Sequence, residues 1–146
     1  PLAPGALDIR YELACVFFAN PLFWMELQHL APEDQAALGK LLKIWKDCRA
    51  DLKDAEVLPI GRMPDGCSLT GFQADCGNGG GYLLLFREPL APAEGVLPIR
   101  PVAAPASLRP LASNLPKDGF SVTCDGDWLT LSMDQPGSYL LLRYRK

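Results

Sequence analysis

The sequence is poor in the residues that metal sites and nucleic-acid interfaces require. It has one histidine, at position 29, and its five cysteines never form a CxxC pair, so it carries no structural zinc motif. Lysine and arginine number 14 against 17 aspartate and glutamate residues, which gives a net charge of −3. A net negative chain without clustered basic residues is a poor partner for nucleic acid. We therefore expect no metal, no cofactor and no nucleic acid as a ligand.

Long hydrophobic runs are also absent. The longest, residues 14–19 and 82–86, are far shorter than the ~20 apolar residues that cross a bilayer, so we expect no membrane span. No basic segment followed by an apolar one opens the chain, and its first residue is proline instead of methionine. The given sequence is therefore compatible with removal of the natural N-terminus together with a signal peptide. Periplasmic, secreted and cytoplasmic locations all stay open.

What the chain has in abundance is apolar residues, glycine and proline. Hydrophobic residues make up 49% of it, enough for a core and too many for disorder. Most of the 13 glycines and 14 prolines follow Asp54, as short strands joined by tight turns require. This change divides the chain into a helical segment, residues 1–54, and a β-domain, residues 55–146.

Two helices are predicted in the first segment. Leu7–Ala19 has apolar residues at helical spacing and ends before Pro21. Pro32–Lys53 starts with a proline and two acidic residues, which suit the first turn of a helix. The apolar stripe of the second helix is expected to pack on the β-domain or on the first helix; it comprises Leu38, Leu41, Leu42, Trp45, Cys48 and Leu52. Between the helices, Leu22–Leu27 fits either a strand or a buried helical turn.

The second segment is expected to be antiparallel β. Seven short strands separated by turns predict a mainly β fold with N-terminal helices, an antiparallel β-sandwich, with a partly closed barrel as the alternative. The strands are Glu56–Ile60, Ser68–Asp75, Tyr82–Glu88, Val96–Val102, Phe120–Cys124, Trp128–Met133 and Ser138–Arg145. Asp125-Gly126 predicts a tight hairpin. Gly77–Gly81 is interpreted as a loose turn, and Ala103–Leu115 as a coil or an edge excursion.

The cysteines give no clear disulfide pattern. Cys15 and Cys48 lie on apolar helix faces, where cysteine usually acts as a small buried hydrophobe. Cys67 and Cys76 flank a predicted strand, so a disulfide between them stays open, although nothing else indicates a disulfide-stabilised fold.

No group of residues predicts a catalytic site. The carboxylates of the β-domain stand in turns beside glycine or proline, where they typically bond the local backbone. Glu26, inside an apolar run and close to His29, is the one acid in an unusual setting. We interpret it mainly as a buried hydrogen-bonding residue, with a catalytic or substrate-binding role as the alternative.

Trp128 is the one candidate for a sugar-stacking ring. In Trp128–Met133 it shares the more polar face with Thr130 and Ser132. The alternative is that its ring covers a sheet edge or meets a neighbouring domain.

Several stretches stand in a characteristic order. Asp8-Ile-Arg-Tyr-Glu-Leu-Ala14 and Asn20-Pro-Leu-Phe-Trp-Met-Glu26 precede a long helix, Glu33–Lys53. Val57–Gln73 and Gly81–Glu88 follow it. This order resembles the C-terminal part of α-galactosidase (melibiase)-like enzymes of glycoside hydrolase family 36 or a close relative. There the first stretches would be the last helix–strand step of a (β/α)8 barrel, followed by the closing helix and a C-terminal β-domain.

The resemblance implies a non-catalytic C-terminal domain of a retaining α-glycosidase. The catalytic aspartates of such enzymes lie on earlier barrel strands, and no position here matches them, so no catalytic residue is assigned. Glu26 would stand near the end of the last barrel strand, on the side where barrel active sites form. The implied partners are the catalytic barrel and carbohydrate.

Two other functions stay open on the sequence alone. One is a carbohydrate-binding module that uses Trp128. The other is an interaction domain for homo-oligomers, indicated by apolar residues on both faces of Tyr82–Phe86. Residues 7–30, rich in aromatics such as Phe17 and Phe18, also predict an apolar patch. The chain can hide this patch by folding the first helix onto the sheet or by self-association, and we expect self-association.

Overall fold

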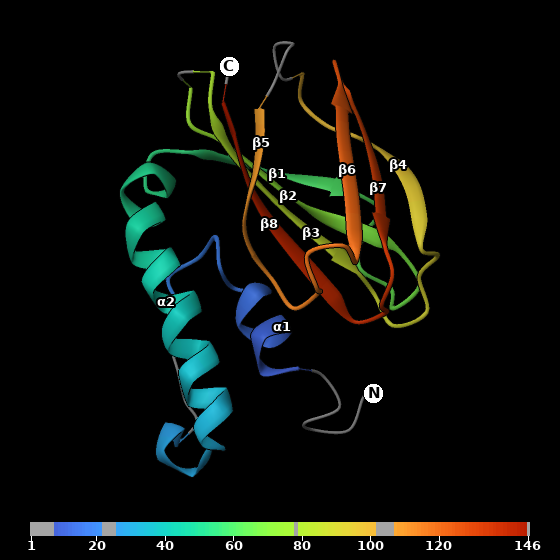
Figure 1. Ribbon diagram of the computed structural model, residues 1–146. Helices are drawn as coiled ribbons and strands as arrows, with labels where there is room; N and C mark the ends of the chain where they lie inside the picture. Colours follow the sequence, from blue (N-terminus) through green and yellow to red (C-terminus); the bar gives the residue numbers. More distant parts are fainter. Residues whose placement is uncertain (1–7, 22–25, 78, 102–106, 146) are drawn as a thin grey trace.

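The computed structural model describes residues 8–21, 26–77, 79–101 and 107–145. These residues form helical elements on the N-terminal side and eight strands in two antiparallel sheets (Figure 1), which confirms the mainly β, sandwich-like fold. The helical elements are α1 (Ile9–Ala14), the 3-10 turn η1 (Leu27–His29) and α2 (Pro32–Leu52). The strands are β1 (Glu56–Gly61), β2 (Leu69–Asp75), β3 (Gly81–Arg87), β4 (Glu94–Pro98), β5 (Ser107–Ser113), β6 (Phe120–Asp125), β7 (Trp128–Met133) and β8 (Ser138–Arg145).

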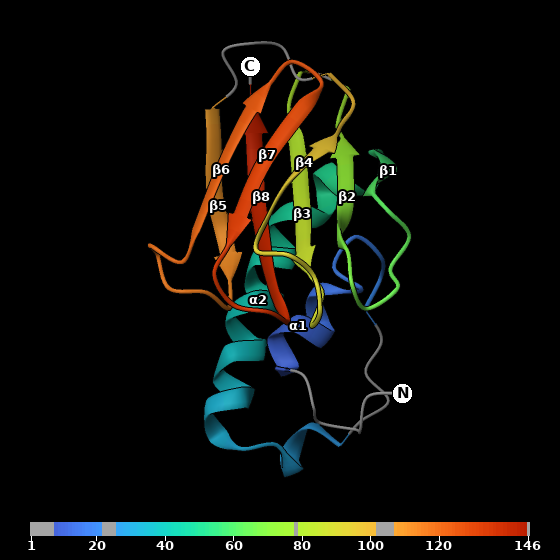
Figure 2. The ribbon, with the colours of Figure 1, turned by 90° about the vertical axis from the view of Figure 1, so that its right-hand side faces the viewer.

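The molecule has three layers. The larger sheet has the strand order β1-β2-β3-β8-β5 and the smaller one the order β4-β7-β6. The smaller sheet stacks on one face of the larger sheet, while α1 and α2 cover the other face (Figures 1 and 2). Two separate hydrophobic clusters result, one between the sheets and one between the larger sheet and the helices.

Strands β3 and β8 are buried on both faces because they lie inside the larger sheet, between these clusters. Successive side chains of a strand point to opposite faces. Leu83 and Leu85 accordingly face the smaller sheet, whereas Tyr82, Leu84 and Phe86 face the helices. None of the five is more than 4% exposed. The apolar character of both faces, which suggested an oligomer interface, is therefore accounted for within one chain.

The helix layer follows the predicted stripe. Leu38, Leu41 and Cys48 of α2 are buried, and Trp45 is partly buried, with its indole nitrogen donating to the carbonyl of Ala19 at 3.3 Å. α2 spans almost the predicted range, and Pro32 occupies its first turn. The stripe packs against α1 and the larger sheet, as expected.

The first helix is shorter than predicted. Asp8 caps α1 by accepting from the backbone N–H of Arg10 at 2.8 Å, but the helix ends at Ala14. The chain then tightens into turns, in which the N–H of Phe17 donates to the carbonyl of Ala14. These turns direct Phe17 into the core, where it is 1% exposed. Among the described residues of the first segment, Leu13, Ala14 and Phe17 are thus buried within the chain itself, and self-association stays a prediction.

Other differences concern edges and turns. Residues 107–113, expected to be a coil or an edge excursion, form β5, a bulged edge strand that carries Pro110 where an edge tolerates it. Strand β4 begins and ends earlier than predicted. The hairpin of β6 and β7 is confirmed, but Asp125 pairs with Trp128 and the turn lies at Gly126-Asp127. The predicted residues Leu7, 22–25, Asn78 and 102–106 lie outside the described part of the chain.

Truncation of a helix-facing leucine should show how much the helix layer contributes to stability. Leu141 of β8 is fully buried in that cluster, so Leu141→Ala is expected to lower the free energy of unfolding by ~2–5 kcal/mol, through lost burial and the remaining cavity. Val57→Ala, on the edge strand β1 where the side chain is exposed, should change it by less than about 0.5 kcal/mol. Urea unfolding followed by circular dichroism measures both. Equal effects would mean that the helices do not seal this face.

The same cluster predicts a loss of stability at alkaline pH. Burial raises the pKa of Tyr11 and of Tyr139 to about 12. Because an unfolded tyrosine titrates near pH 10, the stabilisation is complete below about pH 10 and is lost as the pH rises toward 12. We expect the free energy of unfolding to fall over this window and the fall to be smaller in Tyr139→Phe. An identical fall in that variant, measured by urea titrations at each pH, would contradict this.

Candidate functional site

Trp128 lies where the sequence predicted, on the outer face of the smaller sheet. It is 52% exposed, and Thr130 and Ser132 share its face while Leu129 and Leu131 point into the core. Trp128 pairs with Pro98 of β4 and with Asp125 of β6. The result is an open, mostly polar sheet face with one large ring at one end.

Glu26 is not the buried residue that we expected. Its carboxylate Oε2 lies 2.7 Å from the Nε2 of His29, and both side chains are more than 70% exposed. The pair belongs to η1, which projects away from the sheets, so water surrounds it (Figure 1). An exposed pair of this kind contributes little to stability. The structure does not bring Glu26 and Trp128 together, because η1 and the start of β7 lie at opposite ends of the molecule.

The cysteines are all free in this structure, so the open Cys67–Cys76 alternative is not realised. Cys48 is buried as expected, whereas Cys15 is exposed. Within the described ranges, no three His, Cys, Asp or Glu side chains gather as metal ligands would. No helix in these ranges has the length and apolar character needed to cross a bilayer.

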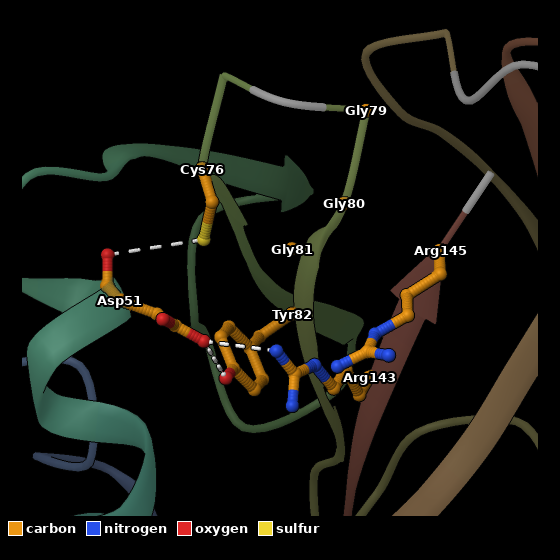
Figure 3. Close-up of a pocket in the computed structure, with 8 residues that line it drawn as sticks. All are labelled: Asp51, Cys76, Gly79, Gly80, Gly81, Tyr82, Arg143 and Arg145. Carbon is orange, nitrogen blue, oxygen red and sulfur yellow. Dashed lines mark hydrogen bonds and ion pairs between the residues drawn. The ribbon is translucent and has the colours of Figure 1, made fainter.

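A polar pocket lies where the C-terminal end of α2 meets the larger sheet (Figure 3). It has a volume of about 290 Å³ and is lined by Asp51, Cys76, Gly79, Gly80, Gly81, Tyr82, Arg143 and Arg145. α2 contributes Asp51, and β8 contributes both arginines. The connection between β2 and β3 contributes Cys76, Gly79 and Gly80, and β3 contributes Gly81 and Tyr82. We call it the Asp51 pocket.

Asp51 joins three elements in this pocket. Its Oδ2 accepts a hydrogen bond from the hydroxyl of Tyr82 at 2.6 Å. The same oxygen forms an ion pair with the guanidinium of Arg143 at 3.0 Å. The guanidinium of Arg143 also lies over the Tyr82 ring, 5.4 Å from its centroid, a cation–π arrangement. Burial, together with the hydrogen bond to Asp51, raises the pKa of Tyr82. The hydroxyl therefore stays protonated and keeps donating.

Glycine at position 81 is required by close packing in the floor of the pocket. A Cβ at this position would collide with the carbonyl oxygen of Ala74 and with the hydroxyl of Tyr144. Gly77 and Gly79 adopt positive φ angles of 75° and 79°, which glycine tolerates without strain. The glycine-rich stretch is thus a connection shaped by backbone geometry, as interpreted, and it also forms one wall of the pocket.

One local pattern in the sequence points to this pocket. In Arg143-Tyr144-Arg145 the alternation of a strand places both arginines on one face. Nothing local predicts that Asp51, 92 positions away from Arg143, meets them.

A second, apolar cavity of about 670 Å³ lies between α1 and the larger sheet. The residues that line it include Tyr11, Phe72, Phe86 and the exposed Leu90. Glu88 also borders it, but its Oε2 accepts the backbone N–H groups of residues 65, 66 and 68 at 2.9–3.1 Å. That carboxylate holds the loop between β1 and β2 in place.

Comparisons of this chain with protein-family models, with curated proteins and with solved structures find no match.

The Asp51 network predicts unequal effects of two substitutions. Tyr82→Phe removes one hydrogen bond and should cost about 1 kcal/mol of unfolding free energy. Asp51→Ala leaves both the Tyr82 hydroxyl and Arg143 without their acceptor and should cost ~1–3 kcal/mol. Asp47→Ala, an exposed position one turn earlier on α2, is the control. If Asp51→Ala and Asp47→Ala unfold at the same urea concentration, the network does not join helix and sheet.

Proposed function

We propose that this chain is the non-catalytic β-domain, with the last helical elements of the barrel, of a retaining α-glycosidase that resembles the α-galactosidases. One observation in support is that the stretches that carry the resemblance coincide with helices and strands of the fold. Asp8–Ala14 contains α1, and Glu33–Lys53 lies along α2. Val57–Gln73 and Gly81–Glu88 contain most of β1, β2 and β3.

The observation that carries the proposal is the projecting segment before α2. η1 buries none of its residues, although it lies between two packed helices. Figures 1 and 2 show η1 and the first turns of α2 extending beyond the end of the sheets. Within the described residues, folding of this domain alone leaves the three residues of η1 exposed. A preceding barrel would cover them.

The apolar cavity lies at the same end of the molecule. Its wall includes α1 and the connections that follow β1 and β3. Leu90 is 77% exposed there, and Met63, next to the lining residue Pro64, is 86% exposed. Exposed apolar side chains grouped around an apolar cavity are typical of a protein interface. Contact with the barrel at this end would cover η1 and the cavity together.

This role predicts that the purified chain does not hydrolyse aryl α-galactosides. Paired carboxylates perform glycoside hydrolysis, and the resemblance assigns that pair to earlier barrel strands. The measurement is release of 4-nitrophenol from 4-nitrophenyl α-galactoside at increasing protein concentrations. Hydrolysis that rises in proportion to the chain and survives repurification would contradict the proposal.

The decisive experiment is to read the gene upstream of codon 1. The proposal expects several hundred in-frame codons with alternating strand and helix patterns before the first residue. A start codon directly before Pro1 would overturn it.

Carbohydrate binding at Trp128 is the second candidate function, favoured by the exposure of this ring beside Thr130 on an open sheet face. Trp128→Ala is expected to abolish retardation of the chain in polysaccharide-containing native gels, since stacking on the ring would supply most of the contact. Val57→Ala, exposed on β1 of the other sheet, is the control. Equal retardation of both variants, or none of the unmodified chain, would remove this candidate.

A further inference from the structure

Strand pairing gathers three arginines on the helix-facing side of the larger sheet. Arg109 of β5 lies directly opposite Arg143 of β8, and Arg145 follows two residues later on the same face. Side chains opposite each other in antiparallel strands have Cβ atoms about 4.5–5.5 Å apart, close enough for like charges to repel. Such a concentration of positive charge is unexpected in a chain whose net charge is −3.

The charges in this group are not balanced. Arg143 has Asp51 as its ion-pair partner. In the part of the chain that the structure describes, the side chains of Arg109 and Arg145 have no ion pair or hydrogen bond. An unpaired guanidinium beside a second one attracts an anion, and arginine binds carboxylate and phosphate through two parallel N–H donors.

The Asp51 pocket holds two of these arginines in a defined arrangement. Figure 3 shows Arg143 and Arg145 on one side of the pocket and Asp51 and Cys76 on the other, with Gly79, Gly80 and Gly81 between the two sides. Arg143 is fixed from two sides, by the carboxylate of Asp51 and by the ring of Tyr82. A guanidinium has five N–H donors, and on Arg143 only Nη2 donates to Asp51. The remaining donors and the whole of Arg145 are available to a ligand.

From this geometry we propose that the Asp51 pocket binds a small organic oxyanion, a carboxylate or phosphate group carried by a molecule about the size of one sugar unit. Arg145 is the main contact, Arg143 the fixed second donor, and Arg109 adds attraction from the neighbouring strand. The volume of about 290 Å³ lies at the lower end of the range for ligand pockets, which favours such a small molecule. The carboxylate of Asp51 repels the anionic group of the ligand, so this group binds on the side of the pocket that Arg145 forms.

Isothermal titration calorimetry of the purified chain tests this site. The probes are galacturonate, galactose 1-phosphate and inorganic phosphate, with galactose as the uncharged comparison, all at the same ionic strength. We expect saturable binding of at least one of the two sugar anions and none of galactose. Binding of galacturonate alone identifies a carboxylate ligand, and binding of galactose 1-phosphate alone identifies a phosphate ligand. Stronger binding of inorganic phosphate than of either sugar anion would contradict an organic ligand.

Substitutions locate the binding. Arg145→Gln is expected to weaken it about tenfold or more, and Arg145→Lys to weaken it less, because lysine keeps the charge but loses the two-pronged geometry. Arg109→Gln should weaken it about two- to threefold, the loss of a more distant charge. Arg62→Gln, an exposed arginine away from the pocket, makes the same change in net charge and is the control.

Three further results would overturn the proposal: no saturable binding of any anion, equal binding of galactose, or equal weakening by Arg145→Gln and Arg62→Gln. Arg145 is exposed near the end of β8, so its variants are expected to fold, and circular dichroism checks this. The outcome does not bear on the glycosidase proposal, because the readout is binding by the chain itself.

Discussion

Leu84 of β3 and Leu141 of β8 lie opposite each other in a strand pair that water does not reach from either face. Covering both faces of this pair is the constraint on which the rest of the structure depends. One face is closed by the β4-β7-β6 sheet and the other by α1 and α2. Removing either layer would expose a continuous apolar surface. The helical segment is therefore part of the packing of the β-domain, whatever else it contacts in a longer protein.

The elements with a strong local pattern could be predicted, and those decided by neighbours could not. α2 and most strands follow from periodicity, proline and glycine. The sequence does not predict β5, because Pro110 and the polar residues around it resemble a coil, and only pairing with β8 makes this segment a strand. A pattern also shows that a face is buried without showing what covers it. The apolar faces of β3 therefore suggested another subunit, whereas the helices of the same chain cover one of them.

The candidate sites illustrate the same limit. Alternation in Trp128–Met133 correctly placed Trp128 on an exposed face, because strand periodicity is a local property. The Asp51 pocket could not be predicted, since its members come from α2, from the β2–β3 connection, from β3 and from β8. This pocket lies at the end of the molecule opposite to η1 and the apolar cavity, so the two candidate surfaces are separate.

Native-state hydrogen exchange followed by NMR tests most directly whether the helix layer and the sheets form one cooperative unit. The structure predicts that amides in the middle of α2, around Leu41, and those of β8, around Leu141, exchange only through global unfolding and give the same free energy of opening. The same denaturant dependence is expected for both sets. If the α2 amides exchange through a much smaller opening while β8 stays protected, the helices are a detachable layer and two-sided burial of β3 and β8 is not the organising constraint.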